Sequence, residues 1–358
     1  MSVLLAATNQ WSSRPADQRF ASLAALDAAV QHHRDAAVEA HNVQLNTLRV
    51  IEKDGLPQLQ SGKGAVAEFT HHSFGQLAKR INAPAAYLRE LPPDMVALNM
   101  NYGLENLPAR DSGEGDTLLF AQNGALVLRA ALSPSYKRIW NSDVTKRIIR
   151  LTEQAPEWQP APAAFDGSRG LYASDKDMFA FLVDNERRIF ESLPGGGLGR
   201  GFFVSNSEVG DASFRLTTFF YEYICGNHRV WGASGVQEIR IPHIGNADEK
   251  AFGKISIELR KYADSSARAD EQKIEAMRKL ELGATKDEVL DAVFNLGTSR
   301  KVAAAAYQIA EQSEERYGNP RSVWGFTGGL TEVARDLPNA DERVNLERQA
   351  GKIMQIAF

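Results

Sequence analysis

The sequence predicts an α+β protein in which a mixed, largely antiparallel sheet with hairpins and packed helices is followed by a helical C-terminal third. Three observations lead to this prediction. Apolar runs broken by turn residues recur up to about residue 247, as strands and hairpins require. Helical spacing with capping signals replaces them from residue 248. The composition, 43% hydrophobic and 24% charged, is that of an ordinary globular chain.

The length of the chain limits the number of folded units, and its net charge limits how it can contact nucleic acid. The chain has 358 residues, enough to bury a large core. We expect units at residues 1–70, 71–247 and 248–358, or one continuous globular unit made of all three. The net charge of −4 exerts no general attraction on phosphate backbones, so contact with nucleic acid requires a local basic patch.

Cys225 is the single cysteine of the chain. An intramolecular disulfide and a Cys-rich zinc site are therefore excluded, and a reducing compartment is favoured. The first residues lack the basic start and the long apolar core of a signal peptide. No run approaches the roughly 20 apolar residues that span a bilayer. We expect a soluble protein of the bacterial host cytoplasm, with no membrane partner.

The first predicted elements are a helix and a hairpin. Apolar residues at helical spacing indicate an amphipathic helix within residues 16–40. Residues 43–53 are strand-like, and the Gly-, Gln- and Ser-rich residues 55–69 predict the returning strand. A further helix is expected to begin at Ser73, because Gln76 follows three residues later as in a capping box.

Turn residues divide the helical region that follows. Asn-Ala-Pro at residues 82–84 interrupts the helix, and a second helix ends near Leu91. The prolines at residues 92–93 then begin a third helix, which continues to about Leu104.

The clearest local prediction is a hairpin. Asn-Gly at residues 123–124 separates two apolar runs, residues 117–122 and 125–131, and this dipeptide is the strongest short-range hairpin signal. A helix should begin at Asp143. Three prolines within residues 155–163 indicate an extended connector.

The remainder of the chain changes from strand to helix. Strand-like runs lie at residues 170–172, 178–183 and 201–204. In the C-terminal third, Thr285 followed by Glu288 predicts the start of a helix by a capping box.

Several segments together resemble the phage- and plasmid-borne family called domain of unknown function 932. The matching segments are residues 73–92, 131–144, 204–216, 223–232 and 322–332. The Ser-Asn-Ser-Glu-Val-Gly piece, followed after an apolar run by Cys-x-Asn, is the most specific part. This chain has His228 where relatives show glycine, and Gly328-Gly329-Leu330 where many show Asn-Ala-x. The resemblance implies an origin in a mobile element and transfers no activity.

The segment 201–229 contains a first candidate site, a pocket for a small ligand. A carboxylate beside a hydroxyl and an amide can bind a metal, orient a sugar or serve as a general base. The alternative is a structural turn, with Asn and Ser bonded to their own backbone, Glu208 solvated and Gly210 supplying a positive φ. The candidate pocket residues are Asn206, Ser207, Glu208, Gly210, Cys225, Asn227 and His228.

Cys225 and His228 do not complete a catalytic or metal-binding pattern. Their spacing places them on one face only in a helix, whereas the preceding residues are strand-like. A free cysteine is commonly a small buried hydrophobe. We therefore predict no metal site and no cofactor, and catalytic residues are not identified.

A second candidate site is a basic and aromatic segment. Cations that contact phosphates beside rings that stack on bases are typical of single-strand binding. The alternative is a solvated helix face whose rings anchor the core. The candidate nucleic-acid-binding residues are Tyr136, Lys137, Arg138, Trp140, Lys146, Arg147 and Arg150.

These observations support two hypotheses and a third without a sequence signature. The first is a phage- or plasmid-encoded accessory protein of replication or recombination that binds or anneals single-stranded nucleic acid and assembles into oligomers. The second is an enzyme, or a protein that binds a small ligand or metal, with its pocket at residues 206–228. The third is an inhibitor of a host defence protein. The sequence favours a non-enzymatic role without establishing it.

Overall fold

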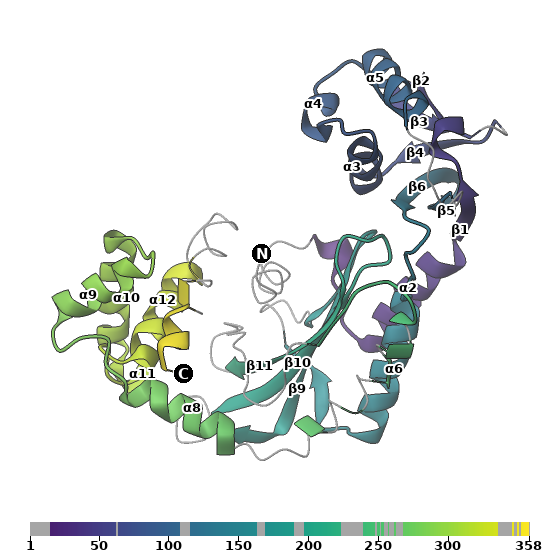
Figure 1. Cartoon of the computed structure of the whole chain (residues 1–358). Helices are drawn as coiled ribbons and strands as arrows, with labels where there is room; N and C mark the ends of the chain where they lie inside the picture. The colour runs from purple at the N-terminus through teal and green to yellow at the C-terminus, as the bar shows by residue number, and fades with distance from the viewer. Residues whose placement is uncertain are drawn as a thin grey trace.

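The structure, a computed structural model, contains two six-stranded sheets within the part of the chain that it describes. It describes residues 15–61, 64–107, 115–162, 169–189, 197–222, 239–247 and 268–335, with short runs and single residues between 249 and 262 and between 346 and 357. Both sheets are mostly antiparallel, and helices form the C-terminal part (Figure 1). The predicted α+β class is confirmed.

The first sheet has the strand order β1-β5-β6-β4-β3-β2. Its strands are β1 (Ala37–Val43), β2 (Arg49–Lys53), β3 (Leu56–Gln60), β4 (Val66–Phe69), β5 (Asp116–Asn123) and β6 (Ala125–Leu132). All neighbours pair antiparallel except β4 and β6, which pair parallel. The helices α3 (His71–Arg80), α4 (Ala85–Arg89) and α5 (Pro93–Glu105) share one apolar core with these strands.

The second sheet has the order β12-β11-β10-β9-β7, with β8 also paired to β9. Its strands are β7 (Trp158–Pro160), β8 (Leu171–Ala173), β9 (Met178–Ile189), β10 (Leu198–Asn206), β11 (Phe214–Glu222) and β12 (Ile239–Ile241). The helices α2 (Leu23–Asp35) and α6 (Asn141–Gln154) pack on it through Leu26, Val144 and neighbouring apolar side chains. Strand β10 lies at the centre of this sheet and is buried along its whole length, including its polar residues Arg200, Ser205 and Asn206.

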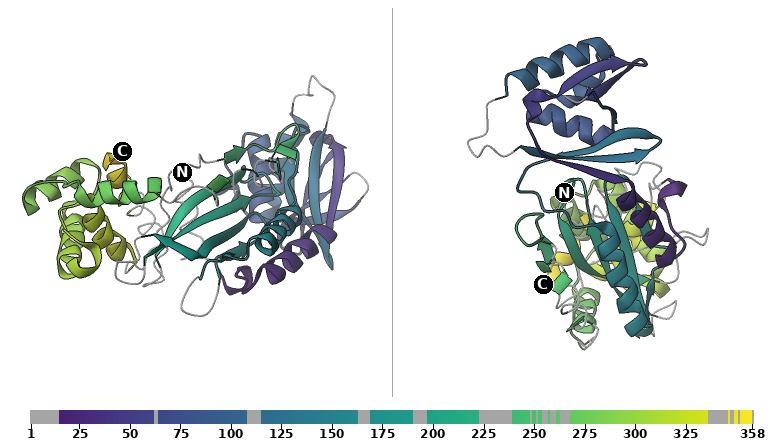
Figure 2. Two further views of the ribbon diagram at one scale, coloured as in Figure 1. Left: turned by 90° about the horizontal axis from the view of Figure 1, so that it is seen from below. Right: turned by 90° about the vertical axis from the view of Figure 1, so that its right-hand side faces the viewer.

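The C-terminal helices and the first sheet lie at opposite ends of the second sheet (Figures 1 and 2). The helices are α8 (Arg268–Lys279), α9 (Lys286–Asn295), α10 (Arg300–Gln312), α11 (Glu314–Tyr317) and α12 (Val323–Arg335). Short 3-10 turns lie at Ala16–Gln18, Leu45–Thr47 and Gln355–Ala357. The predicted boundary at residue 70 falls inside the first sheet, directly after β4.

Two local predictions agree closely with the structure. Strands β5 and β6 form the predicted hairpin, and Gly124 adopts the positive φ of 83° that its turn needs. Helix α9 is capped by Thr285, whose Oγ1 accepts a hydrogen bond from the backbone N–H of Glu288 at 3.3 Å. Both signals act within a few residues, so they do not depend on the rest of the fold.

The predicted N-terminal helix is present as Leu23–Asp35, and the chain then forms edge strand β1, which pairs with β5. Two predicted helix starts are wrong. Helix α3 begins at His71 with Thr70 as its cap, whereas Ser73 is buried and its Oγ donates to the carbonyl of Leu128 at 2.6 Å. Helix α6 begins at Asn141 rather than at Asp143.

Glycines of α12 allow it to pack closely on α10, on α11 and on the turn that precedes it. A Cβ added at Gly329 would lie 2.0 Å from the carbonyl oxygen of Ala306, and one at Gly325 would lie 2.1 Å from that of Asn319. The adjacent Gly328 faces the ring of Tyr317 in the same way. The Gly328-Gly329 pair is therefore required by the packing of α12 on its neighbours.

We expect Gly329→Ala to lower the free energy of unfolding by about 1–3 kcal/mol, because the added methyl must push α10 and α12 apart. Gly253→Ala is the matched control, since this helical glycine has nothing within 4 Å of its added Cβ. The control should be neutral or stabilising by up to about 1 kcal/mol. Urea denaturation monitored by circular dichroism compares the two, and equal midpoints would contradict the close-packing argument.

Candidate functional site

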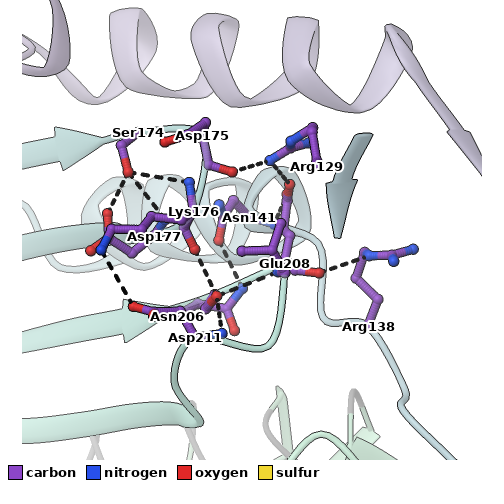
Figure 3. Close-up of polar contacts among 12 residues, drawn as sticks. Arg129, Arg138, Asn141, Ser174, Asp175, Lys176, Asp177, Asn206, Glu208 and Asp211 are labelled. Carbon is purple, nitrogen blue, oxygen red and sulfur yellow. Dashed lines mark hydrogen bonds and ion pairs between the residues drawn. The ribbon is translucent and has the colours of Figure 1, made fainter. Parts of the chain in front are cut away.

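The Ser-Asn-Ser-Glu-Val-Gly segment forms a buried corner where the two sheets meet. It follows directly from β10, and the residues from Asn206 to Val209 are each at most 1% exposed. Gly210 ends the corner with a φ of 79°, a conformation that other residues rarely adopt. The side chains of this corner point into the protein rather than into an open cavity (Figure 3).

Glu208 binds two elements through its two carboxylate oxygens. Arg129 of β6 donates from Nη2 to Oε2 at 3.2 Å, and the same nitrogen also donates to the carbonyl of Asp175 at 2.7 Å. The backbone N–H of Asn141 donates to Oε1 at 2.8 Å. Asn141 is the first residue of α6, whose Trp140 cap supplies no side-chain bond. Glu208 thus caps α6 from another part of the chain, where a helix N-terminus favours negative charge.

The amide nitrogen of Asn206 and the hydroxyl of Ser207 also hold the fold together. Asn206 Nδ2 donates to the carbonyl of Ile139 at 2.8 Å and to Oδ1 of Asn141 at 2.7 Å. Ser207 Oγ donates to the carbonyl of Lys176 at 2.6 Å and accepts from the backbone N–H of Asp211. These contacts attach the corner to α6 and to the turn between β8 and β9.

Helix α3, which packs on the first sheet, holds the corner by donating hydrogen bonds to one of the corner's backbone carbonyls. His72 Nε2 and Gln76 Nε2, both on α3, donate to the carbonyl of Val209 at 3.1 and 2.7 Å. The chain after β6 adds two further donors: the hydroxyl of Tyr136 reaches the carbonyl of Ser207, and Nε of Arg138 reaches that of Glu208.

For the described part of the predicted pocket, the structure favours a structural role over a ligand site. The turn alternative is wrong in two details: Glu208 is buried rather than solvated, and Asn206 bonds to Ile139 and Asn141 rather than to its own backbone.

The remaining predicted pocket residues, Cys225, Asn227 and His228, lie outside the described residues. Among the residues that are described, no group of three or more His, Cys, Asp or Glu side chains is placed to hold a metal ion. No helix in this part of the chain is long and apolar enough to cross a membrane.

The structure separates the predicted basic and aromatic residues into an inner and an outer set, so they do not share one accessible surface. Tyr136 stacks on His243 with ring centroids 4.9 Å apart, and burial raises its pKa. The guanidiniums of Arg34 and Arg138 lie 5.2 and 5.0 Å from the centroid of the Trp140 ring. Both predicted stacking rings are therefore committed to contacts within the chain.

Arg138 also belongs to the inner set. Its guanidinium pairs with Glu39 of β1, and its Nε bonds the corner carbonyl described above. Burial lowers its pKa to about 10, an effect that nearby Glu208 partly opposes, so the group remains charged at neutral pH. This arginine joins the sheets and is not available for phosphate.

The outer set lies on the solvent side of α6. Lys146, Arg147 and Arg150 are exposed and line an open depression of about 670 Å³, which we call the α6 pocket. The rest of its lining is Asp143, Glu249, Phe252 and Gly253. Lys137, the remaining predicted residue, is exposed but does not line this pocket.

In the α6 pocket, Asp143 has an ion-pair partner, whereas Lys146 and Arg147 contact neutral groups. Asp143 is paired with Arg34 of α2 at 2.7 Å. Lys146 donates to the neutral amide oxygen of Gln31 at 2.6 Å, and Arg147 lies over the ring of Phe252 at 3.9 Å. Within the described residues, none of the three cations of the outer set forms an ion pair with a carboxylate. The pocket therefore presents three cations, one half-buried ring and the carboxylate of Glu249, which accepts from the neutral amide of Asn246, so cations are in excess for an anionic ligand.

Phe252 was missed by the sequence interpretation. It lies in a separate helical stretch after β12, and nothing in the local sequence indicates that it packs beside α6. Its contact with Arg147 depends on the path of the chain around the second sheet.

Comparisons with family models, curated proteins and solved structures find no match to this chain.

The corner yields a stability prediction. Glu208→Gln removes the charge that compensates buried Arg129 while keeping the shape of the side chain. We expect the free energy of unfolding to fall by about 3–5 kcal/mol, the usual cost of leaving one member of a buried ion pair alone. Adding Arg129→Met should recover much of this loss, because no unpaired charge then remains. Urea denaturation tests both variants. An unchanged midpoint for Glu208→Gln would contradict the view that the charge of Glu208 stabilises the contact between Arg129 and the start of α6.

His243 yields a prediction about pH. It is 5% exposed, and burial, with a smaller contribution from Arg138, lowers its pKa from 6.5 to about 4, although its bond to the carbonyl of Lys137 opposes the shift. Between these two pH values the unfolded chain binds more protons than the folded one, so stability should fall as the pH is lowered from 6.5 to 4.

The expected contribution of His243 across that window is about 3 kcal/mol. His243→Phe keeps a ring beside Tyr136 but cannot titrate, so it should flatten this part of the profile. His33, whose pKa is also lowered mainly by burial, is present in both proteins and cancels in the comparison. Denaturation midpoints measured at several pH values provide the test. Parallel profiles for the wild type and the variant would show that His243 is not the titrating group.

Proposed function

We propose that this protein binds single-stranded nucleic acid at the α6 pocket, as an accessory protein of phage or plasmid replication or recombination. The supporting observation is the group of three exposed cations, Lys146, Arg147 and Arg150, which face one depression without an ion pair among the described residues. The mobile-element part of the proposal comes from the family resemblance.

The chemistry of the pocket favours a single strand over a duplex. Cations spaced along a helix can follow successive phosphates, and a half-buried ring beside them offers an apolar surface to an unstacked base. The bases of a duplex are stacked inside it and cannot enter a depression of this kind. Since Arg147 already lies over Phe252, a base would contact the ring together with the guanidinium plane.

The charge balance implies weak binding by one chain. With three phosphate contacts, the logarithm of the binding constant should fall with the logarithm of salt concentration with a slope of about −2 for a single strand. The chain as a whole is negatively charged, so no long-range attraction adds to these contacts. Binding should therefore be strongest at low salt and should increase when several chains act on one strand.

Fluorescence anisotropy with a labelled oligonucleotide, measured over a salt series, tests the proposal. The triple variant Lys146→Ala, Arg147→Ala and Arg150→Ala should lose binding at low salt, because it removes all three phosphate contacts. The matched control Lys279→Ala, Lys286→Ala and Lys301→Ala changes the net charge equally at exposed positions of α8, α9 and α10, and it should bind like the wild type. Absence of wild-type binding at low salt, or equal losses in the two triple variants, would overturn the proposal.

A further inference from the structure

Helix α5 is apolar on more than one face. Residues 95–104 read Met-Val-Ala-Leu-Asn-Met-Asn-Tyr-Gly-Leu and contain no charged side chain. The charges of α5 lie at its ends, with Asp94 in the first turn and Glu105 in the last. Exposed helices usually carry charges along the solvent side, as α8 does with its alternating acidic and basic residues. A helix that is apolar around its circumference is normally covered on all sides.

One face of α5 is covered within the chain. Val96, Met100 and Leu104 are buried in the core of the first sheet. Asn101 holds the helix to β2, since its side chain both accepts from the N–H of Val50 at 2.7 Å and donates to the carbonyl of Val50 at 2.8 Å. These contacts fix which residues point away from the sheet.

The opposite face carries large apolar side chains in solvent. Met95, Leu98 and Tyr102 are 45%, 70% and 72% exposed. Their spacing of three and four residues places them in one row along the helix, which we call the α5 stripe. The helix lies at the outer end of the first-sheet lobe (Figures 1 and 2), so the fold leaves room for a partner there.

We propose that the α5 stripe is a self-association surface on which a second copy of this chain packs, with the two α5 helices antiparallel. The stripe is self-complementary in this arrangement. A twofold axis beside Leu98 places Met95 of one copy opposite Tyr102 of the other, so that apolar side chains meet along the row.

Charge complementarity at the ends of the stripe supports the same partner. At the C-terminal end, Arg49 of β2 reaches Glu105 with its Nη2 3.2 Å from Oε1. In the antiparallel pair, Asp94 of each copy approaches this end of the other copy, where the exposed Arg49 can bridge it to Glu105. Nucleic acid is a poor occupant by comparison, because the row itself has no cation and both ends of the helix carry a carboxylate.

With three exposed apolar side chains from each copy at its centre, the interface should be small and the dimer reversible. Interfaces that bury less than about 1,200 Å² in total are typical of weak or transient association. The surface lies on a different lobe from the α6 pocket, so association should occur without nucleic acid. The inference therefore stands independently of the proposed function.

Sedimentation velocity over a range of concentrations tests the surface directly. We expect the full-length wild type to form dimers at high concentration and Leu98→Glu to raise the dissociation constant by at least about tenfold, because it buries a charge at the axis. The matched control is Ile244→Glu, at a side chain that is 55% exposed on the segment after β12, and it should not change the dissociation constant. A wild type that stays monomeric throughout, or a dimer that Leu98→Glu does not weaken, would overturn the proposal.

Exchanging the charges of Asp94 and Arg49 tests the antiparallel orientation. Because two different variants are compared alone and as a mixture, the result does not depend on how one variant folds. Asp94→Arg places like positive charges together at both ends of the pair, and Arg49→Asp places like negative charges there, so each variant alone should dimerise at least about tenfold more weakly. Mixed in equal amounts, the two variants place opposite charges together at both ends and should associate to within a few-fold of the wild type. A mixture that associates no better than the separate variants would contradict this geometry.

Discussion

The arrangement of this protein depends on how the charge of Glu208 is compensated. A carboxylate taken out of water is costly unless it is paired and hydrogen-bonded. Here Arg129 supplies the countercharge from the first sheet, and the N–H of Asn141 supplies a bond from the start of α6. One side chain at the end of β10 therefore fixes three elements at once, and a shift of any of them would leave a buried charge unsatisfied.

This brace also determines the position of the α6 pocket. Helix α6 packs Val144 and Ile148 against the second sheet and turns Lys146 and Arg150 outward. Since Glu208 holds the first residue of the helix, it sets where the exposed turns lie relative to Phe252. The Ser-Asn-Ser-Glu-Val-Gly segment thus stabilises the fold. The proposed ligand contacts come instead from residues of α6 that form no distinctive sequence pattern.

The sequence predicts features that are determined locally and misses those that arise from packing. The turn at Gly124 and the cap at Thr285 follow from backbone preferences over a few residues, and both are present. The aromatic and basic residues after β6 appear as one segment in the sequence, but the connection between β6 and α6 turns Tyr136 and Arg138 inward. The burial of Glu208 depends on Arg129, which lies 79 positions earlier, and no local pattern records that pairing. Exposure is likewise set by neighbours, so the stripe on α5 can be recognised only after its covered face is known.

The two proposed surfaces occupy different lobes, and this separation has a physical consequence. Contacts between copies through α5 would leave the cations of α6 open to solvent. Two chains would then present six phosphate-binding side chains to one strand, and the second set would bind at the effective concentration created by the first. A modest number of cations per chain is compatible with useful affinity under these conditions. The polar junction braced by Glu208 would then matter for assembly as well as for folding, because it sets the distance and direction between the association surface and the pocket.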